Sequence, residues 1–365
     1  MKVLEIIKDD LENNIDKIKE RAKNTKIIAV IKGNGYGLGL HELANFLVQK
    51  GISYLAVSSV EEAIELANIE NINAKILCLE STAVQEELYE LLNKDIIITI
   101  GSLEAANVLS KLAKKENKKV KVHLKIDTGF SRYGFLYNQK EIILKVIKEN
   151  PSFLVEGIFS HFSNAYADNE NYTKMQFYRF LSVKEFLEEN GINIPIYHIA
   201  NSSAFLKYDD MFLDAVRIGS AFLGRVIVEN KIGLKRIGML KSNVVEIKEL
   251  KKGTKIGYSN SYTLKRNSQI AVVPVGYSDG FHVAVKNDTF KFVDRLRILK
   301  NSFMNVFKKD GINVYIKNLK YPVIGKVGMN HIVVDITDSD VKINDEVRMD
   351  ISPVLVSSKI RREYI

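Results

Sequence analysis

The sequence has little that would suit an extracellular or membrane protein. Cys78 is the only cysteine among 365 residues, so the chain can form no internal disulfide, and this usage is typical of a reducing cytoplasm. No apolar segment approaches the roughly 20 residues that cross a membrane. The N-terminal stretch MKVLEIIKDDLENN turns acidic too early for a signal peptide. We therefore expect a cytoplasmic protein that does not bind membranes.

Composition and charge exclude further classes of function. A hydrophobic content of 46% and a charged content of 27% are ordinary for a globular protein. Lysine and arginine outnumber aspartate and glutamate by 53 to 44, and the resulting net charge of +9 is spread along the chain. Because nucleic-acid binding needs a concentrated basic surface, we do not expect it. The length exceeds that of one average domain, so we expect two domains.

The most informative stretch is IIAVIKGNGYGLG, residues 27–39. Its first five residues are apolar and predict a strand that is buried on both faces, as in a parallel sheet. Lys32 follows directly, so its amine would leave a dry core where the strand ends. Loss of hydration lowers the pKa of an ammonium group, and a free amine can form a Schiff base with an aldehyde. The alternative is a lysine that merely reaches solvent from a strand end.

Two common glycine motifs do not fit this stretch. A dinucleotide-binding fingerprint would need a glycine where Leu38 stands, three residues after Gly35. A phosphate-binding P-loop would need its lysine after the glycines rather than before them. The glycines at every second position, from Gly33 to Gly39, instead allow a tight bend and close approach of the backbone to a ligand. Nucleotide binding is therefore disfavoured.

Eight short apolar runs alternate with helical patterns between residues 27 and about 225. Such alternation predicts right-handed βαβ units, and eight units favour a closed (β/α)₈ TIM-type barrel over an open sheet. We assign residues 1–230 to this barrel. Residues 231–365 are β-rich with short turns, which predicts a separate C-terminal mostly-β domain. Within it, residues 287–311 have apolar positions at helical spacing and predict an inserted basic amphipathic helix.

Polar residues end several of the predicted barrel strands. Barrel enzymes place their chemistry at the carboxyl ends of the strands, so these residues should meet at one rim. Each alone has an ordinary structural explanation as a cap, an ion-pair partner or a hydrogen-bonded core residue. Together at one rim they favour a functional site. They are Lys32, Asp127, His161, Asn201, Ser202 and Arg217.

These motifs resemble those of the alanine racemase family of pyridoxal-phosphate enzymes, and the resemblance runs nearly end to end. AVIKGNGYGLG is similar to the family's cofactor-lysine motif, which implies that Lys32 binds pyridoxal 5′-phosphate and that Tyr36 reaches its phosphate. HLKIDTGFSRYGF is similar to the segment whose arginine, here Arg132, holds the substrate carboxylate. The remaining cofactor-binding residues that the resemblance implies are His161, Asn201, Ser202, Arg217, Gly219 and Ser220.

The resemblance extends into the second domain. KIGYSNSY is similar to the motif of a second catalytic base, here Tyr258, and VGYSDG to the region that places Tyr277 at the site entrance. GKVGMN is similar to the segment whose methionine, here Met329, lies near the substrate carboxylate. Members of the family are head-to-tail homodimers with shared active sites. Lys125 stands at the equivalent of a lysine that is often carbamylated.

The implied activity is interconversion of L- and D-alanine by two bases, with no metal. Racemisation removes the α-proton from one face and returns one to the other, so it needs an acid/base group on each side, here Lys32 and Tyr258. Arg217 would face the pyridine nitrogen, and because a guanidinium stays protonated it would leave the ring a weaker electron sink than a carboxylate partner would. We infer fewer side reactions such as transamination.

The sequence departs from the family pattern at several positions. Ser131 stands where glycine is usual, Gly328 and Asn330 stand where cysteine and aspartate are common, and His282 stands where an arginine often follows the DG pair. The insertion between the two parts of the second domain is longer than typical. The C-terminus lacks an obvious counterpart of the family's phosphate-assisting tyrosine. A wider entrance could admit serine or basic amino acids.

Other readings compete with alanine racemisation. The same scaffold could racemise serine, ornithine or lysine, or could bind pyridoxal phosphate without racemising, although the β domain with Tyr258 argues against the latter. An amino-acid decarboxylase would share barrel and β domain, but Arg217 and the core-like Cys78 count against it. The basic insertion could add a docking surface for a membrane or partner.

Overall fold

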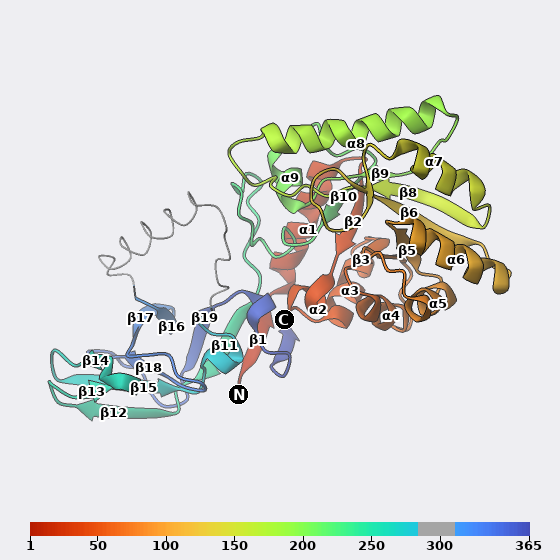
Figure 1. Ribbon diagram of the computed structural model, residues 1–365. Coiled ribbons are helices and arrows are strands. Elements are labelled where there is room, and N and C mark those ends of the chain that lie inside the picture. The colour runs from red at the N-terminus through yellow and green to blue at the C-terminus, as the bar shows by residue number, and fades with distance from the viewer. Residues whose placement is uncertain (284–310) are drawn as a thin grey trace. The chain divides into compact units, whose positions relative to one another are not determined.

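The computed structural model describes residues 1–283 and 311–365, and its chain divides into two compact units (Figure 1). One unit comprises Ile7–Ile237 and the other comprises Met1–Ile6 together with Gly238–Ile365. The predicted amphipathic helix at 287–311 lies, apart from Gly311, outside the described residues. None of the described helices is long and apolar enough to cross a membrane.

The first unit is a closed parallel barrel, as the sequence predicts. Its strands follow one another around the barrel in the order β2–β3–β4–β5–β6–β8–β9–β10, and β10 pairs in parallel with β2 to close it. The short strand β7 (Phe135–Leu136) adds to β6. The barrel strands are β2 (Lys26–Val30), β3 (Tyr54–Val57), β4 (Lys75–Cys78), β5 (Ile97–Ile100), β6 (Val120–Asp127), β8 (Phe153–Phe159), β9 (Tyr197–His198) and β10 (Ala215–Ile218).

The helices around this barrel bury apolar residues, and three of them begin with a side-chain cap. Ser59, Ser102 and Asn201 cap three of them by accepting a hydrogen bond from a backbone amide three residues later. The helices are α1 (Lys8–Ala22), α2 (Lys32–Tyr36), α3 (Leu40–Gln49), α4 (Val60–Ala67), α5 (Gln85–Asn93), α6 (Leu103–Lys115), α7 (Lys140–Glu149), α8 (Asn171–Glu189) and α9 (Ser202–Lys207).

Inside the barrel, alternate residues of neighbouring strands form the core. Strand residues two apart point to the same side, so Ile28 and Val30 pack with Ala56 and Leu77 in one buried cluster. Tyr54, 6% exposed, belongs to the same cluster. The interior is therefore packed rather than open.

The second unit is a mostly antiparallel sheet in the order β12–β15–β18–β17–β16–β19–β11–β1–β20, with a small β13–β14 pair. Its strands are β1 (Val3–Ile6), β11 (Met239–Asn243), β12 (Glu246–Leu250), β13 (Lys255–Ile256), β14 (Tyr262–Thr263), β15 (Ser268–Val273), β16 (Asn313–Ile316), β17 (Leu319–Ile324), β18 (Ile332–Asp335), β19 (Glu346–Asp350) and β20 (Arg361–Tyr364).

The first six residues differ from their sequence-based placement in the barrel. Strand β1 pairs with β11 and β20, and buried Glu5 accepts a hydrogen bond of 2.8 Å from Arg348. Met1–Ile6 consequently belong to the second unit. A pattern of single residues could not reveal this, because the partners of β1 lie more than 230 residues away.

Candidate active site

Lys32 begins an unusual left-handed turn at the carboxyl end of β2. The φ angles of Gly33, Asn34, Gly35 and Tyr36 are 63°, 53°, 63° and 52°. Glycine adopts this region freely, whereas Asn34 is stabilised there by donating its backbone amide to Glu62 at 3.0 Å. The turn brings both Lys32 and Tyr36 into one cavity.

A cavity of about 400 Å³ opens at this end of the barrel. It is lined by ten of the eleven barrel residues that the sequence singled out for a site; the exception is Asp127. The structure thus brings together segments up to 188 positions apart along the chain. These residues are Lys32, Tyr36, Lys125, Arg132, His161, Asn201, Ser202, Arg217, Gly219 and Ser220.

Arg217, 3% exposed, is the most heavily bonded side chain of the cavity. Its Nη1 donates to His198 Nδ1 at 2.7 Å, and its Nη2 donates to Ser160 O at 2.6 Å and to His161 Nδ1 at 3.1 Å. In the described part of the chain, Nε is the nitrogen of Arg217 that has no acceptor. Burial lowers the pKa of Arg217 to about 9, so the guanidinium still carries its charge at neutral pH.

Two lysines of the cavity are held toward their neutral form. Burial, followed by the positive charge of Arg132, lowers the pKa of Lys32, while Glu62 opposes this change. Burial and the charge of Arg217 lower the pKa of Lys125 well below its ordinary value. Lys125 is 5% exposed and donates to Ile126 O at 3.3 Å. In both cases the lowered pKa favours the neutral amine, which is the form that acts as a nucleophile or base.

The lining of the cavity also offers hydroxyl and amide groups. Ser202 Oγ accepts hydrogen bonds from the backbone amides of Gly219 at 3.0 Å and Ala221 at 3.3 Å. A side chain at Gly219 would place its Cβ 2.5 Å from the Tyr36 hydroxyl, so glycine is required for Tyr36 to pack here. Burial raises the pKa of Tyr36 to about 12, which keeps its hydroxyl a hydrogen-bond donor.

The loop that carries Arg132 is folded around one carboxylate. Asp127 Oδ1 accepts hydrogen bonds from the backbone amides of Gly129, Phe130 and Ser131 at 2.8, 2.9 and 3.1 Å. Ser131 has a φ of 62°, which explains why glycine is usual at this position in the family it resembles. The Arg132 guanidinium lies over the Phe130 ring, 4.6 Å from its centroid. This contact limits the positions that the guanidinium can take.

The three candidate residues of the second unit also gather in one region. Tyr277 N donates to Gly328 O at 3.1 Å, so the segment of Tyr277 lies beside that of Met329. A Cβ at Gly328 would lie 3.7 Å from a ring carbon of Tyr258 and 2.9 Å from His331 O, so the glycine leaves room for this arrangement. Tyr258, Tyr277 and Met329 are 70%, 48% and 53% exposed.

Comparison with known proteins accounts for this combination of units. Residues 6–226 match the model of the alanine racemase N-terminal domain, and residues 237–353 match that of the alanine racemase C-terminal domain. The chain belongs to the alanine racemase family. An alanine racemase of Methanococcus maripaludis is 35% identical over 92% of this chain and 85% of its own, and one of Clostridium tetani is 36% identical over 94% and 84%.

Solved structures agree with this membership. The alanine racemase of Clostridium difficile 630 superposes with a TM-score of 0.87 at 29% identity, covering 100% of this chain and 95% of its own. The alanine racemase of E. faecalis superposes with a TM-score of 0.84 at 26% identity, covering 100% of this chain and 98% of its own. The order of barrel and β unit is therefore that of the alanine racemase family.

Two acidic residues near the site were missed by sequence reasoning. Glu80 lines the cavity and accepts a hydrogen bond of 3.3 Å from Tyr133, the neighbour of Arg132. It directly follows the run AKILCL, so the rule that polar residues at strand ends form the site could have identified it. Glu62 lies on α4, and nothing in the local sequence indicates that it supports the Lys32 turn.

Proposed function

We propose that the protein interconverts L- and D-alanine with pyridoxal 5′-phosphate, with Lys32 and Tyr258 as bases on opposite faces of the substrate. The observation that carries this proposal is that Lys32, with its lowered pKa, shares one cavity with Arg132 and Arg217. When bound, pyridoxal phosphate supplies an electron sink that makes the α-proton of an attached amino acid acidic. Binding, orientation and proton movement are the work of the chain's own residues.

The residues of the cavity fit this cofactor. The Tyr36 and Ser202 hydroxyls, the Asn201 side chain at the start of α9 and the backbone near Gly219 and Ser220 are suited to hold its phosphate. At the other end, Arg217 Nε is a buried donor without an acceptor in the described residues, which is the environment that a ring nitrogen would complete. His161 accepts from Arg217 through Nδ1, so its neutral ring carries its proton on Nε2 and packs beside the same group.

Arg217 is suited to moderate the reaction. Its charge persists at neutral pH and its hydrogen bonds hold it rigidly, so it donates a hydrogen bond without giving up a proton. An uncharged ring nitrogen withdraws electrons less strongly than a protonated one. Arg217 thus favours prompt return of the proton to the substrate over transamination.

Lys32 is suited to accept a proton from the substrate, and Arg132 is suited to hold the substrate in place. The lowered pKa of Lys32 favours the neutral amine, which is the form that can accept the α-proton. Arg132 binds the substrate carboxylate, and its loop is anchored by Asp127, which fixes the bond that is presented for cleavage.

We propose further that Lys125 carries a carbamate. Its neutral amine adds to carbon dioxide and releases one proton, which converts a buried base next to two arginines into an anion that pairs with them. The support is the strongly lowered pKa of Lys125, whose causes include Arg217 and Arg132. Carbon-13 NMR in ¹³C-bicarbonate tests it: a carbamate signal that disappears in Lys125→Ala is expected, and an identical spectrum in that variant contradicts it.

Tyr258 is proposed to act from a second copy of the chain in a head-to-tail homodimer. Tyr258 and Met329 are among the more exposed large side chains of their unit, as expected for residues that meet another surface. The family resemblance assigns them to the neighbouring barrel's cavity. Each active site would then need both subunits, and Tyr277 and Met329 would narrow its entrance.

Exchange in deuterium oxide tests the activity. The protein with pyridoxal phosphate is incubated with L-alanine, and both α-proton exchange and D-alanine are followed. Tyr258→Phe should lower racemisation by about 10²-fold or more, whereas Tyr315→Phe, a control on β16, should leave it unchanged. If the α-proton exchanges but no D-alanine forms, the protein binds pyridoxal phosphate without racemising alanine, and the proposal is wrong.

Mixing two inactive variants tests the shared site. If Lys32→Ala and Tyr258→Phe subunits exchange, half of the dimers combine one of each, and each mixed dimer has one intact site. Activity should recover to about a quarter of the wild-type value. No recovery after verified subunit exchange would contradict a site built from two chains.

The position of Glu80 in the cavity suggests a second group of substrates, amino acids with a polar side chain. It is the only carboxylate among the described residues that line the cavity, and it lies beside the Arg132 loop. A carboxylate there could accept a hydrogen bond from the hydroxyl of serine or from the side-chain amine of ornithine or lysine. The same assay with these amino acids, in the wild type and in Glu80→Gln, decides this. If one of them reacts faster than alanine and its rate falls in the variant, that amino acid is the preferred substrate.

A further inference from the structure

A chain of four buried polar side chains crosses the barrel interior from the catalytic cavity. Arg217 on β10 contacts His198 on β9, with Nη1 to Nδ1 at 2.7 Å. His198 Nε2 contacts His123 Nδ1 on β6 at 3.0 Å, and His123 Nε2 contacts the Tyr54 hydroxyl on β3 at 2.9 Å. All four residues are at most 6% exposed. Four separate strands thus contribute to one hydrogen-bonded line.

Arg217 sets the direction of every hydrogen bond in this line. A guanidinium only donates, so His198 must accept at Nδ1 and carry its proton on Nε2. His198 therefore donates to His123 Nδ1, and His123 in turn donates from Nε2 to the Tyr54 oxygen. Because the Tyr54 oxygen is the acceptor in this contact, the hydroxyl hydrogen of Tyr54 takes no part in the line. It has no acceptor in the part of the chain that the structure describes.

The packing preserves this line of polar groups. A side chain at Gly157 would place its Cβ 2.5 Å from the His123 ring, so only glycine leaves room for that ring. The ring of Phe159 is stacked on that of His198, with centroids 5.0 Å apart and planes 9° apart. Burial raises the pKa of Tyr54, so its hydroxyl keeps the hydrogen that it offers.

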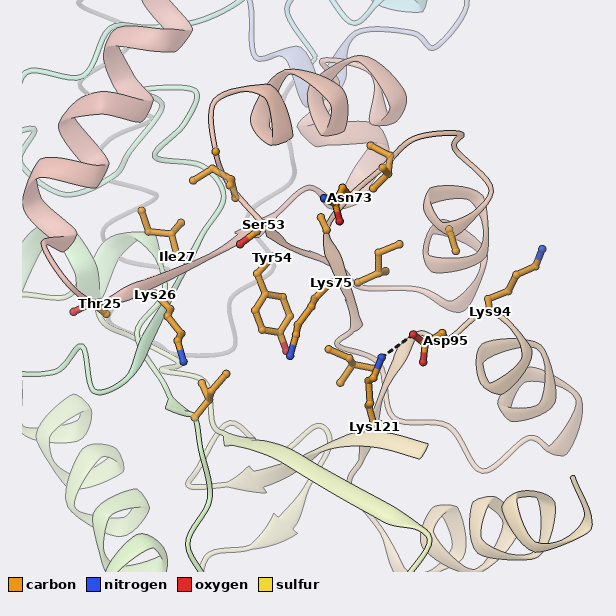
Figure 2. Close-up of a pocket in the computed structure, with 18 of the residues that line it drawn as sticks. Thr25, Lys26, Ile27, Ser53, Tyr54, Asn73, Lys75, Lys94, Asp95 and Lys121 are labelled. Carbon is orange, nitrogen blue, oxygen red and sulfur yellow. Dashed lines mark hydrogen bonds and ion pairs between the residues drawn. The ribbon is translucent and has the colours of Figure 1, made fainter. Parts of the chain in front are cut away.

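Tyr54 lines a second cavity, of about 780 Å³, at the amino ends of the barrel strands. Lys26, Lys75 and Lys121 surround it (Figure 2). Each lies two residues before an interior residue of its strand, respectively Ile28, Leu77 and His123, and therefore points to the same side. These three lysines, here called the basal lysines, extend the barrel interior to its amino-terminal face.

The charge around this basal cavity is unbalanced. Lys75 pairs with Glu156 and Lys121 with Asp95, both at 2.7 Å. Lys26 has no ion-pair partner among the described residues. The lining contains five lysines and a single carboxylate, that of Asp95. A concave surface with this surplus concentrates anions.

We propose that the basal cavity binds a small oxyanion, a phosphate or a carboxylate, through the Tyr54 hydroxyl and the basal lysines, and that its presence is transmitted to Arg217. The Tyr54 hydroxyl donates to the anion, and its oxygen becomes a stronger acceptor for His123. Each following hydrogen bond is strengthened in turn, because linked hydrogen bonds polarise one another. The final step, an altered Arg217 at the cofactor ring, rests on the proposed function.

Proximity already links the two ends electrostatically. The pKa of His123 is lowered to about 3 by burial and then by the charges of Lys75 and Arg217, one from each end of the line. An anion on the basal lysines offsets the first of these charges. The line therefore senses the basal cavity through charge as well as through hydrogen bonds.

Titration calorimetry tests the binding. Inorganic phosphate and, separately, citrate are titrated into the protein saturated with pyridoxal phosphate, at constant ionic strength maintained with chloride. Saturable binding of one anion per chain is expected. Lys26→Gln should weaken it about fivefold or more, and Tyr54→Phe likewise, whereas Lys111→Gln on the exposed face of α6 should not change it. Lys26 is exposed at the start of its strand, so its replacement does not endanger folding.

Two results overturn the site: no saturable binding of either anion, or equal binding in Lys26→Gln and Lys111→Gln. Absorbance of the bound cofactor tests transmission. A shift with anion is expected in the wild type and should be lost in Tyr54→Phe at anion concentrations that saturate this variant. Binding without a shift in the wild type overturns the transmission and leaves the site. Failure to bind pyridoxal phosphate would refute the proposed function; the same titrations made without the cofactor would then decide the anion site alone.

Discussion

Three histidines of the barrel should make the stability of the protein unusually sensitive to mild acid. His123, His161 and His198 are held neutral, since burial and the charge of Arg217 lower all three pKa values, with Lys75 also acting on His123. In the unfolded chain each titrates near ~6.5, so the unfolded state binds more protons below that pH. Stability is therefore fully present above pH ~6.5 and is lost as the pH falls toward the folded pKa values.

The magnitude follows from linkage. A histidine with an unfolded pKa of ~6.5 that stays neutral in the folded state lowers the free energy of unfolding by about 2 kcal/mol between pH 7 and pH 5. Three such histidines lower it by about 6 kcal/mol. This is comparable with the entire stability of many domains. Urea unfolding at both pH values and at fixed protein concentration measures it.

Matched variants isolate the contribution of one buried histidine. His198→Asn should reduce the loss between pH 7 and pH 5 by about 2 kcal/mol, whatever its effect at pH 7. His41→Gln, which removes a histidine whose side chain is 53% exposed, serves as the matched surface control. An equal loss in wild type and both variants would refute the reasoning.

Three further predictions concern the catalytic cavity. Asp127→Ala removes the acceptor of three backbone amides and should raise the KM for alanine about tenfold or more by loosening Arg132, as steady-state kinetics would show; an unchanged KM contradicts the anchoring role. Gly219→Ala places a Cβ 2.5 Å from the Tyr36 hydroxyl and should weaken pyridoxal-phosphate binding about tenfold in equilibrium dialysis. Unchanged binding would contradict the role of Tyr36 as a ligand. Arg217→Glu should increase transamination, seen as pyridoxamine phosphate by chromatography; its absence would contradict the moderating role of Arg217.

Local patterns were sufficient to predict the barrel and the rim of its cavity. Residues 28–31 of the first apolar run are buried in the structure because parallel strands in a barrel have covered faces. Polar residues near the end of such runs or just after them, including His161 and Arg217, meet at one end because the strands are parallel. The same rule would have found Glu80, which was passed over. The roles of these residues remain predictions until they are tested.

Sequence by itself determined the strand alternation, the position of Lys32 after its strand and the family motifs, because these depend on residues close along the chain. Only the tertiary structure decided which distant groups touch. The line from Arg217 through His198 and His123 to Tyr54 joins four strands, and no local period encodes it. The removal of Met1–Ile6 from the barrel has the same origin, since pairing with β11 and β20 is a long-range contact. Hydrogen-bond direction, burial and shifted pKa values arise from such contacts and so appear only in the folded chain.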